Sequence, residues 1–340
     1  MTNGIGPLAA YLLCGILVSA CWGPHAATPS RAAPIVADCE VAQLAHWGKG
    51  LVSAVVYSPD GRLLAVTPTP RGIYLYDAET LEQVRFIEIE IGVWSLAFSS
   101  SGSVLASGLD DGSVLLWRVD DGTLIRALEG HRGPVWSLSF STDGETLASA
   151  SYDATVRVWR VLDGNLKCTL DGHDDYFNAV AFSPDGTILA SGGGTWPSYV
   201  TQLWQVHDCT PLRTLEESYA VSSLAFSPQG DVLASGSYGT GEVGLWRVPE
   251  GSRQTTLGGS AELLQSVAFA PDGATLATGS SHGPVMLWRI ADGSLLYTLE
   301  GHSDSVWSLD FSPDGTTLAS ASMDGTVRLW QVPPAGRHEI

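Results

Sequence analysis

The sequence predicts an all-β fold, a seven-bladed β-propeller of four-stranded antiparallel blades. The first observation is a repeat, because the segment from Val306 to Trp330 recurs seven times in variant form. The second is regular spacing, since the glycine that closes one turn of each copy returns every 41 to 44 residues. The third is that the repeated region shows no sustained helical period. The turn glycines are Gly61, Gly102, Gly144, Gly186, Gly230, Gly273 and Gly315.

Each copy is predicted to hold four strands, as the third copy illustrates. Residues 137–141 form a first strand that leads into the turn closed by Gly144. Residues 146–151 form a second strand, whose small side chains suit a crowded interior. Residues 155–159 alternate β-branched and polar side chains, which is typical of a third strand. An Asp-Gly pair then favours a hairpin turn before an outer strand, because glycine accepts a positive φ without strain.

The outer strand is predicted at positions such as 295–299 in the sixth copy. The copies are further expected to form a closed ring. Four strands of this length cannot bury both faces of their sheet alone, so the copies must stack radially. The last copy stops after its third strand, whereas residues 40–46 precede the first copy as a strand without partners. We expect residues 40–46 to complete the last blade and remove an exposed edge.

Residues that recur among the copies connect the chain to a known family. Three copies carry a Gly-His pair, at Gly130-His131, Gly172-His173 and Gly301-His302. Six copies end the third strand with Trp, and Tyr76 takes this place in the first copy. In these residues, over positions 39–332, the chain resembles the WD-repeat family, although Arg or Gln, never Asp, follows each Trp. The six are Trp117, Trp159, Trp204, Trp246, Trp288 and Trp330.

Two copies place His, Ser, Asp and Trp at the same offsets, which raises the question of a catalytic triad. A triad is needed once, whereas this set recurs, and the resemblance implies a buried hydrogen-bond network in each blade. We therefore expect structural tetrads and no catalytic residues. The tetrads are His131, Ser149, Asp153 and Trp159 in the third copy and His302, Ser320, Asp324 and Trp330 in the seventh.

The other copies carry incomplete tetrads. The second has Ile89 in place of His, and the fourth has Thr195 in place of Asp. The first, fifth and sixth copies lack both His and Asp at these offsets. We expect amide hydrogens in the fifth and sixth blades to exchange before those in the third and seventh, because fewer buried hydrogen bonds hold them.

The charge balance argues against polyanionic partners. The formal net charge is −19, with only 17 Lys and Arg, so nucleic acid and anionic membrane surfaces would repel the protein. Neither a Cys-x-x-Cys pair nor a calcium-loop spacing occurs. We therefore expect no nucleic-acid partner, no metal and no cofactor.

The N-terminal part is predicted to direct export. Residues 1–20 have no charged side chain and are interpreted as a signal peptide. The Val-Ser-Ala-Cys sequence resembles a bacterial lipoprotein signal, which implies lipidation of Cys21, although no basic residue precedes the apolar run. A generic signal peptide or an early start codon are the alternatives. Residues 21–38 are then a flexible tether, residues 39–334 the propeller and residues 335–340 a tail.

The cysteines leave the pairing open. Cys39, Cys168 and Cys209 follow the presumed signal, and one bridge among the three is compatible with an oxidising compartment.

Three copies begin the innermost strand with Val-Trp-Ser-Leu, and the position of this Trp allows two interpretations. Strict alternation places Trp136 on the face of Leu138 and Phe140, which favours packing between blades. Four other copies have a polar residue there, which favours an exposed rim. The polar residues are Ser53, Asn178, Ser222 and Gln265.

We favour the exposed interpretation, in which the indoles form a crescent at the channel mouth, interrupted at Ser53. This surface is expected to bind a peptide or loop of a partner protein, with a basic side chain stacked on Trp. Residues 192–200 of the fourth copy, which carry three extra residues and Trp196, are expected to form a second contact. The predicted partner-binding residues are Trp94, Trp136, Trp307, Tyr152, Tyr176, Met323 and Asp110.

Taken together, these features predict a non-catalytic interaction scaffold, a monomeric propeller held outside the cytoplasmic membrane by a lipid. Two alternatives stay open. One is a propeller enzyme, a hydrolase or dehydrogenase with its active site in the channel. The other is a cytoplasmic WD-repeat adaptor.

Overall fold

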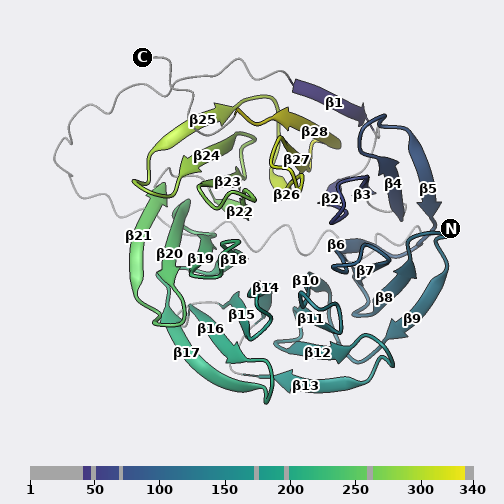
Figure 1. Cartoon of the computed structure of the whole chain (residues 1–340), viewed down its shortest axis with the longest axis horizontal. Helices are drawn as coiled ribbons and strands as arrows, with labels where there is room; N and C mark the ends of the chain where they lie inside the picture. The colour runs from purple at the N-terminus through teal and green to yellow at the C-terminus, as the bar shows by residue number, and fades with distance from the viewer. Residues whose placement is uncertain are drawn as a thin grey trace, which may run out of the picture. The chain divides into compact units, whose positions relative to one another are not determined.

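The computed structural model describes residues 41–46, 51–68, 72–171, 176–194, 199–258 and 263–333. These residues fold into seven antiparallel sheets of four strands each. The sheets follow one another around a ring, with the first strand of each blade innermost (Figure 1). The predicted all-β, seven-bladed propeller is confirmed. Residues 21, 39, 173 and 195–198, on which several expectations rest, lie outside the described residues.

The strands of the first four blades run outward in chain order. Blade 1 holds β2 (Val52–Tyr57), β3 (Leu63–Pro68), β4 (Ile73–Asp77) and β5 (Gln83–Ile87). Blade 2 holds β6 (Val93–Phe98), β7 (Val104–Leu109), β8 (Val114–Arg118) and β9 (Leu124–Leu128). Blade 3 holds β10 (Val135–Phe140), β11 (Thr146–Ser151), β12 (Val156–Arg160) and β13 (Leu166–Leu170). Blade 4 holds β14 (Phe177–Phe182), β15 (Ile188–Gly193), β16 (Val200–Gln205) and β17 (Thr210–Glu216).

The last three blades repeat this order, with one exception at the ring closure. Blade 5 holds β18 (Val221–Phe226), β19 (Val232–Ser237), β20 (Glu242–Arg247) and β21 (Arg253–Gly258). Blade 6 holds β22 (Leu264–Phe269), β23 (Thr275–Ser280), β24 (Val285–Arg289) and β25 (Leu295–Leu299). Blade 7 holds β26 (Val306–Phe311), β27 (Thr317–Ser322), β28 (Thr326–Gln331) and, from the other end of the chain, β1 (Val41–His46).

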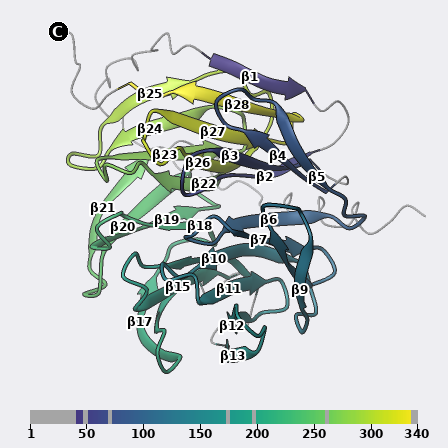
Figure 2. The ribbon, with the colours of Figure 1, turned by 45° about the vertical axis from the view of Figure 1, so that its right-hand side comes forward.

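The ring closes through β1, as the sequence predicts. β1 pairs antiparallel with β28, so that Val41 lies opposite Trp330 and His46 opposite Thr326. It lies alongside β28 at the outer edge of blade 7 (Figure 2). The innermost strands also contact one another in sequence around the ring, and β26 returns to contact β2. The N-terminal strand therefore ties both ends of the repeat into one sheet.

The core lies between neighbouring blades. One apolar cluster joins Ala148 and Val158 of blade 3 to Phe177 and Trp204 of blade 4. The second strands carry small residues where the blades come closest, and Ala148 is fully buried. The six Trp residues that end the third strands are also buried in these interfaces. Each blade therefore needs both neighbours to cover its faces, as expected for radial stacking.

Each innermost strand contains a bulge at its second residue, and this changes where that residue points. Val135 lies opposite Ser151 while Ser137 lies opposite Ala150, so Trp136 is an extra residue in the ladder. The same shift surrounds Trp94 and Trp307. A bulge redirects a side chain and interrupts the alternation of faces. The strict alternation that grouped Trp136 with Leu138 and Phe140 is therefore wrong at this position.

Candidate interaction face

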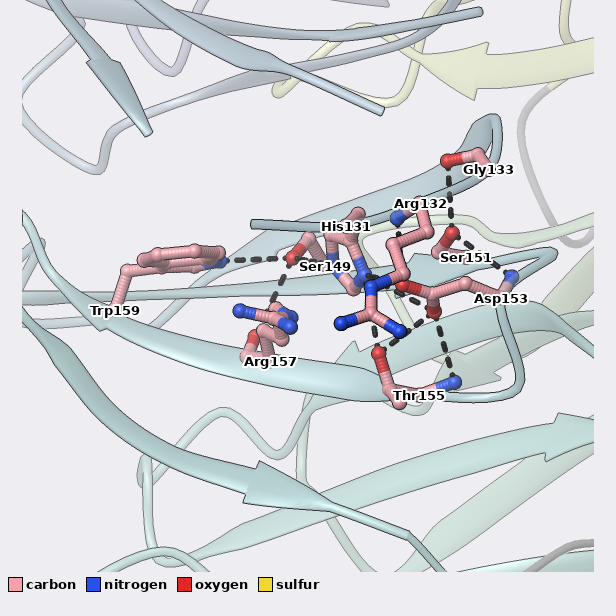
Figure 3. Close-up of polar contacts among 9 residues, drawn as sticks. All are labelled: His131, Arg132, Gly133, Ser149, Ser151, Asp153, Thr155, Arg157 and Trp159. Atoms are coloured by element: carbon pink, nitrogen blue, oxygen red, sulfur yellow. Dashed lines mark hydrogen bonds and ion pairs between the residues drawn. The ribbon is translucent and has the colours of Figure 1, made fainter. Parts of the chain in front are cut away.

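The third blade contains a continuous chain of hydrogen bonds through the four tetrad residues (Figure 3). Trp159 Nε1 donates to Ser149 Oγ at 2.8 Å, and Ser149 Oγ lies 2.7 Å from His131 Nε2. His131 Nδ1 lies 3.0 Å from Asp153 Oδ2. With the proton on Nδ1, each donor has an acceptor: the indole N–H donates to the hydroxyl, the hydroxyl to the imidazole, and the imidazole to the carboxylate. The network links the third strand, the second strand and the loop before β10.

The seventh blade repeats this geometry. Trp330 Nε1 donates to Ser320 Oγ at 2.8 Å, and His302 lies 2.7 Å from Ser320 Oγ and 2.9 Å from Asp324 Oδ2. Burial lowers the pKa of His302, an effect that Asp324 only partly opposes. Burial alone would raise the pKa of Asp324, but hydrogen bonds from Thr326, His302 and the Ser303 amide lower it to about 2. The pair at neutral pH is therefore a neutral imidazole that donates to an ionised carboxylate.

These serines are poorly placed to act as nucleophiles. Ser149 and Ser320 are fully buried at 0% exposure, so no substrate atom can approach either hydroxyl. Each hydroxyl already accepts from an indole and bonds to an imidazole. A catalytic triad requires a nucleophile within reach of the substrate. The geometry is that of a hydrogen-bond network that holds each blade.

The part that persists in every copy with a strand-end Trp is the indole hydrogen bond. In blades 2, 4 and 5 it ends on Ser107, Ser191 and Ser235, and in blade 6 on Thr278. In blade 2 Ile89 is buried where His would stand. With no imidazole at position 89, the carboxylate of Asp111 is exposed and accepts hydrogen bonds from the amide and hydroxyl of Ser113 in its own turn.

Blade 5 contains a tetrad member that the sequence analysis did not anticipate. Glu217 stands 18 residues before Ser235, the same offset that separates His131 from Ser149. It accepts a hydrogen bond from Thr201 Oγ1 at 3.0 Å and is hydrogen-bonded to Ser235 and Trp246. Burial raises the pKa of Glu217, although these hydrogen bonds oppose the shift. The missed signal was the fixed offset, because a carboxylate can accept from the serine as an imidazole nitrogen does.

Replacing Asp324 by Ala is expected to destabilise the protein by about 1–3 kcal/mol, because the buried His302 loses the acceptor of its Nδ1 proton. Urea denaturation at pH 7 measures the change. Asp111→Ala in blade 2 is the matched control, since it removes an exposed carboxylate with no histidine partner and should cost less than about 0.5 kcal/mol. Equal losses in the two variants would contradict the assigned role of the tetrad.

The three indoles at the start of innermost strands contact one another, and we call them the indole cluster: Trp94, Trp136 and Trp307. Their ring centroids are 4.7, 5.6 and 6.2 Å apart, within the range of direct aromatic contact. All three side chains are half-buried. Trp94 Nε1 donates to Asp110 Oδ1 at 2.9 Å, whereas the Nε1 atoms of Trp136 and Trp307 are buried without a hydrogen-bond partner.

The expected crescent is thus a compact cluster, and Ser53 does not form an open gap in it. Ser53 is 4% exposed, and its hydroxyl donates to the Val93 carbonyl at 2.6 Å. A short hydroxyl side chain can reach the neighbouring blade from this position, as Asn178 also does toward Val221. The indoles at this position in blades 2, 3 and 7 instead contact one another.

The remaining predicted rim residues occupy equivalent positions next to the loops that enter the innermost strands. The amides of Asp110, Tyr152 and Met323 donate to the carbonyls of Gly92, Pro134 and Ser305, respectively. The Tyr152 ring stacks on Tyr176 with centroids 5.0 Å apart, and Tyr152 is 44% exposed. Asp110, Tyr176 and Met323 are partly buried.

A second tyrosine pair follows in the next blade. Tyr199 stacks on Tyr219 at 6.1 Å, and Tyr219 and Tyr238 are both exposed. The sequence analysis missed Tyr199 and Tyr219, although the pair repeats the placement of Tyr152 and Tyr176: one ring before a third strand, one before the next innermost strand. Of the insertion at residues 192–200, positions 195–198 with Trp196 lie outside the described residues.

Carboxylates dominate the described loops at the same end of the ring. Glu90, Glu129, Asp171 and Asp304 are exposed in the loops that enter innermost strands. Arg132 is the one Lys or Arg in the described parts of these loops and of the turns between second and third strands. The face therefore combines aromatic surface with negative charge.

The described residues were also considered as metal ligands and as membrane spans. They contain no cluster of three or more His, Cys, Asp or Glu able to hold a metal ion. Among them there is also no helix with the length and apolar character needed to cross a membrane.

Comparison with known families agrees with the repeat. The family model described as "WD domain, G-beta repeat" matches residues 89–118, 122–160, 164–196, 209–246, 251–289 and 293–331. The six matched segments cover more than half of the chain, and β2–β5 of blade 1 lie outside them.

Proposed function

This chain belongs to the WD-repeat family, and from that premise we propose that it is a non-catalytic scaffold that captures a basic segment of a partner protein. Propellers of this family generally bind proteins or peptides. Capture takes place on the indole cluster and the acidic loops around it. No residue acts as a nucleophile, acid or base in this function, and no metal or cofactor takes part.

The single observation that carries the proposal is the indole cluster. Half-buried aromatic side chains at a surface supply large contact area at low entropic cost. The buried Nε1 groups of Trp136 and Trp307 have no acceptor within the protein. Because these two atoms are buried, a partner contacts the exposed parts of the indole rings and not Nε1.

The spacing of the rings limits how the partner can bind. With centroids 4.7–6.2 Å apart, the rings touch, and no side chain fits between them. The partner therefore lies on the solvent-exposed face of the indole cluster. A Lys or Arg there can stack on an indole while its charge meets Asp110 and the exposed carboxylates of the entry loops.

A defined peptide tests the proposal. A random-peptide display library is selected on the full-length protein, and the strongest binder is also synthesised with Gln at each Lys and Arg. Trp136→Ala/Trp307→Ala should weaken binding at least tenfold, and the Gln peptide should bind more weakly than its parent. Leu162→Ala is the matched control, because Leu162 is 86% exposed on a turn between third and outer strands.

The affinity of each variant is read together with its melting temperature, because each indole contacts the other two and its removal can also destabilise the fold. Asp110→Asn provides a milder variant that removes a charge but no ring. Unchanged peptide affinity in both folded variants would contradict the proposal.

We propose further that the protein is exported and held at a membrane by a lipid on Cys21. An uncharged N-terminal segment that ends in Val-Ser-Ala-Cys supports this proposal. A disulfide between Cys168 and Cys209 is also typical of proteins outside the reducing cytoplasm. Mass spectrometry of the N-terminal peptide after cell fractionation should find an acylated Cys21 in membranes. An unprocessed Met1 peptide in the cytosol would favour the cytoplasmic adaptor.

A further inference from the structure

The junction between blades 3 and 4 differs chemically from its neighbours. Cys168 of β13 is bonded to Cys209 in the turn between β16 and β17, with the two Cα atoms 6.6 Å apart. Both residues are only partly buried and pack against the apolar cluster between the two blades. The bond therefore links the outer strand of one blade to the outer turn of the next.

Three other blades place an arginine at the position of Cys168, whereas blade 5 has Thr255 and blade 6 has Tyr297 there. In blade 3, Cys168 pairs with Val158, and at the same point of the ladder Arg85 pairs with Leu75 and Arg126 with Leu116. Blade 4 continues the pattern with Arg213 opposite Leu203. The outer strand thus presents a cation at this position in three of the first four blades.

These arginines clasp the next blade. The Arg85 guanidinium donates to the carbonyls of Asp120 and Asp121, in the turn between the third and outer strands of blade 2. Arg126 donates to the Leu162 carbonyl of blade 3 at 3.4 Å. The contact runs from each outer strand to the equivalent turn of the following blade.

Glycine makes room for the arginine stem, and Cys209 stands where this glycine would be. A Cβ at Gly122, Gly164 or Gly251 would collide with the side chain of Arg85, Arg126 or Arg213, respectively. Cys209 occupies the same point of the turn, four residues after Gln205, as Gly164 is four residues after Arg160. Its φ is +61°, close to the +74° of Gly164, so a side chain is carried in a conformation that favours glycine.

We propose that the Cys168–Cys209 disulfide is a covalent clasp that replaces the arginine-over-glycine clasp at one junction, and that it makes this junction dependent on thiol–disulfide exchange. The substitution is reciprocal: cysteine replaces the arginine on one blade and the glycine on the other. A change at only one of the two positions would not preserve a clasp, because Cys168 has no guanidinium and Cys209 has a side chain where the arginine stem would lie. After reduction the junction keeps the Lys167 Nζ bond to the Val206 carbonyl, but it loses the clasp while Cys209 retains its positive φ.

The exchange balances with a small-molecule disulfide as the oxidant. One cysteine thiolate attacks the small disulfide, which forms a mixed disulfide and releases one small thiolate. The second cysteine thiolate attacks the protein sulfur of this mixed disulfide, forms the Cys168–Cys209 bond and releases the second small thiolate. Two electrons pass from the protein to the oxidant, and the two cysteine protons end on the released thiols. A dithiol reductant reverses both steps.

Thermal unfolding of the full-length protein, with and without dithiothreitol, tests the proposal. Peptide mapping without reduction first identifies the Cys168–Cys209 link. The reductant should lower the Tm of the wild type by roughly 5–10 °C, since the bond closes a long loop. It should leave Cys168→Ser/Cys209→Gly unchanged. A wild-type Tm that does not change with the reductant, or free thiols at Cys168 and Cys209 in the peptide map, would contradict the proposed clasp.

A pair of double variants tests the equivalence of the two clasps. Cys168→Arg/Cys209→Gly rebuilds the arginine-over-glycine arrangement, and Cys168→Ser/Cys209→Gly shares its relief of the positive φ but has no cation. The arginine variant should melt at a higher temperature than the serine variant and be insensitive to the reductant. Equal melting temperatures would show that the arginine cannot take the place of the disulfide, which would refute the equivalence. Neither measurement depends on the peptide binding proposed above.

Discussion

A protein that lacks residues 41–46 is expected to be less stable as a whole ring, not only at one end. β1 is the outer strand of blade 7 and pairs along β28, which is otherwise the outermost strand of that sheet. Its removal exposes one edge of β28, where Trp330 is 1% exposed in the intact ring. Each lost backbone hydrogen bond contributes about 1 kcal/mol net, so the expected loss is about 3 kcal/mol or more.

Denaturation and hydrogen exchange together check this expectation. Because blade 7 packs on both blade 6 and blade 1, exchange should accelerate in β2 and β22 as well as in β26. Ala42→Pro offers a milder version, since proline cannot donate to the ladder with Leu329, whose backbone groups face β1. Removal of residues 335–340, which follow the last strand, is the control. If the truncated protein unfolded at the same denaturant concentration as the full chain, closure through β1 would carry no stability.

Asp310→Asn is expected to stabilise the protein at pH 8 and to have little effect near pH 4. Asp310 lies on β26 and accepts a hydrogen bond from the Tyr57 amide of blade 1 at 2.7 Å. Burial raises the pKa of Asp310 to about 7, although the amide hydrogen bonds oppose the shift. The folded protein therefore holds the proton more tightly than the unfolded chain. This contribution to stability is present below pH 3.8 and is lost as the pH rises through about 7.

The expected gain for Asp310→Asn at pH 8 is about 2–4 kcal/mol, since one pKa unit corresponds to about 1.4 kcal/mol and the residue is not fully screened from water. Urea denaturation from pH 4 to pH 8 measures it. Asp314→Asn, in the neighbouring turn, is a control of opposite sign, because hydrogen bonds from Ser312 and Thr316 lower the pKa of Asp314. A parallel pH dependence of the wild type and Asp310→Asn would contradict the assignment.

The architecture could be predicted because it rests on features that repeat. The turn glycines fix the register of seven copies, and the ten-residue spacing of Ser149 and Trp159 recurs in four of the six blades that form the indole hydrogen bond. The unpaired strand before the first copy and the missing strand after the last copy together predicted the closure, which β1 confirms. Repetition turns each weak local signal into a consistent pattern.

The features that escaped prediction occur once or depend on a local irregularity. The bulge at Trp136 has no distinct residue type, so alternation gave the wrong neighbours for this side chain. Glu217 takes the place of histidine with a different functional group, a carboxylate that is hydrogen-bonded to the tetrad serine Ser235. The pairing of Cys168 with Cys209 could not be chosen among three cysteines without knowing which blades lie side by side.

A footprint of the bound peptide shows whether the indole cluster is the surface at which this propeller binds its partner. Hydrogen exchange is compared in the full-length protein with and without the selected peptide. We expect protection in the loops at residues 88–92, 129–134 and 300–305 and at the start of β6, β10 and β26, which carry the three indoles. Protection along the outer strands β5, β9 and β13, or at the turns closed by Gly102 and Gly144, would contradict this expectation.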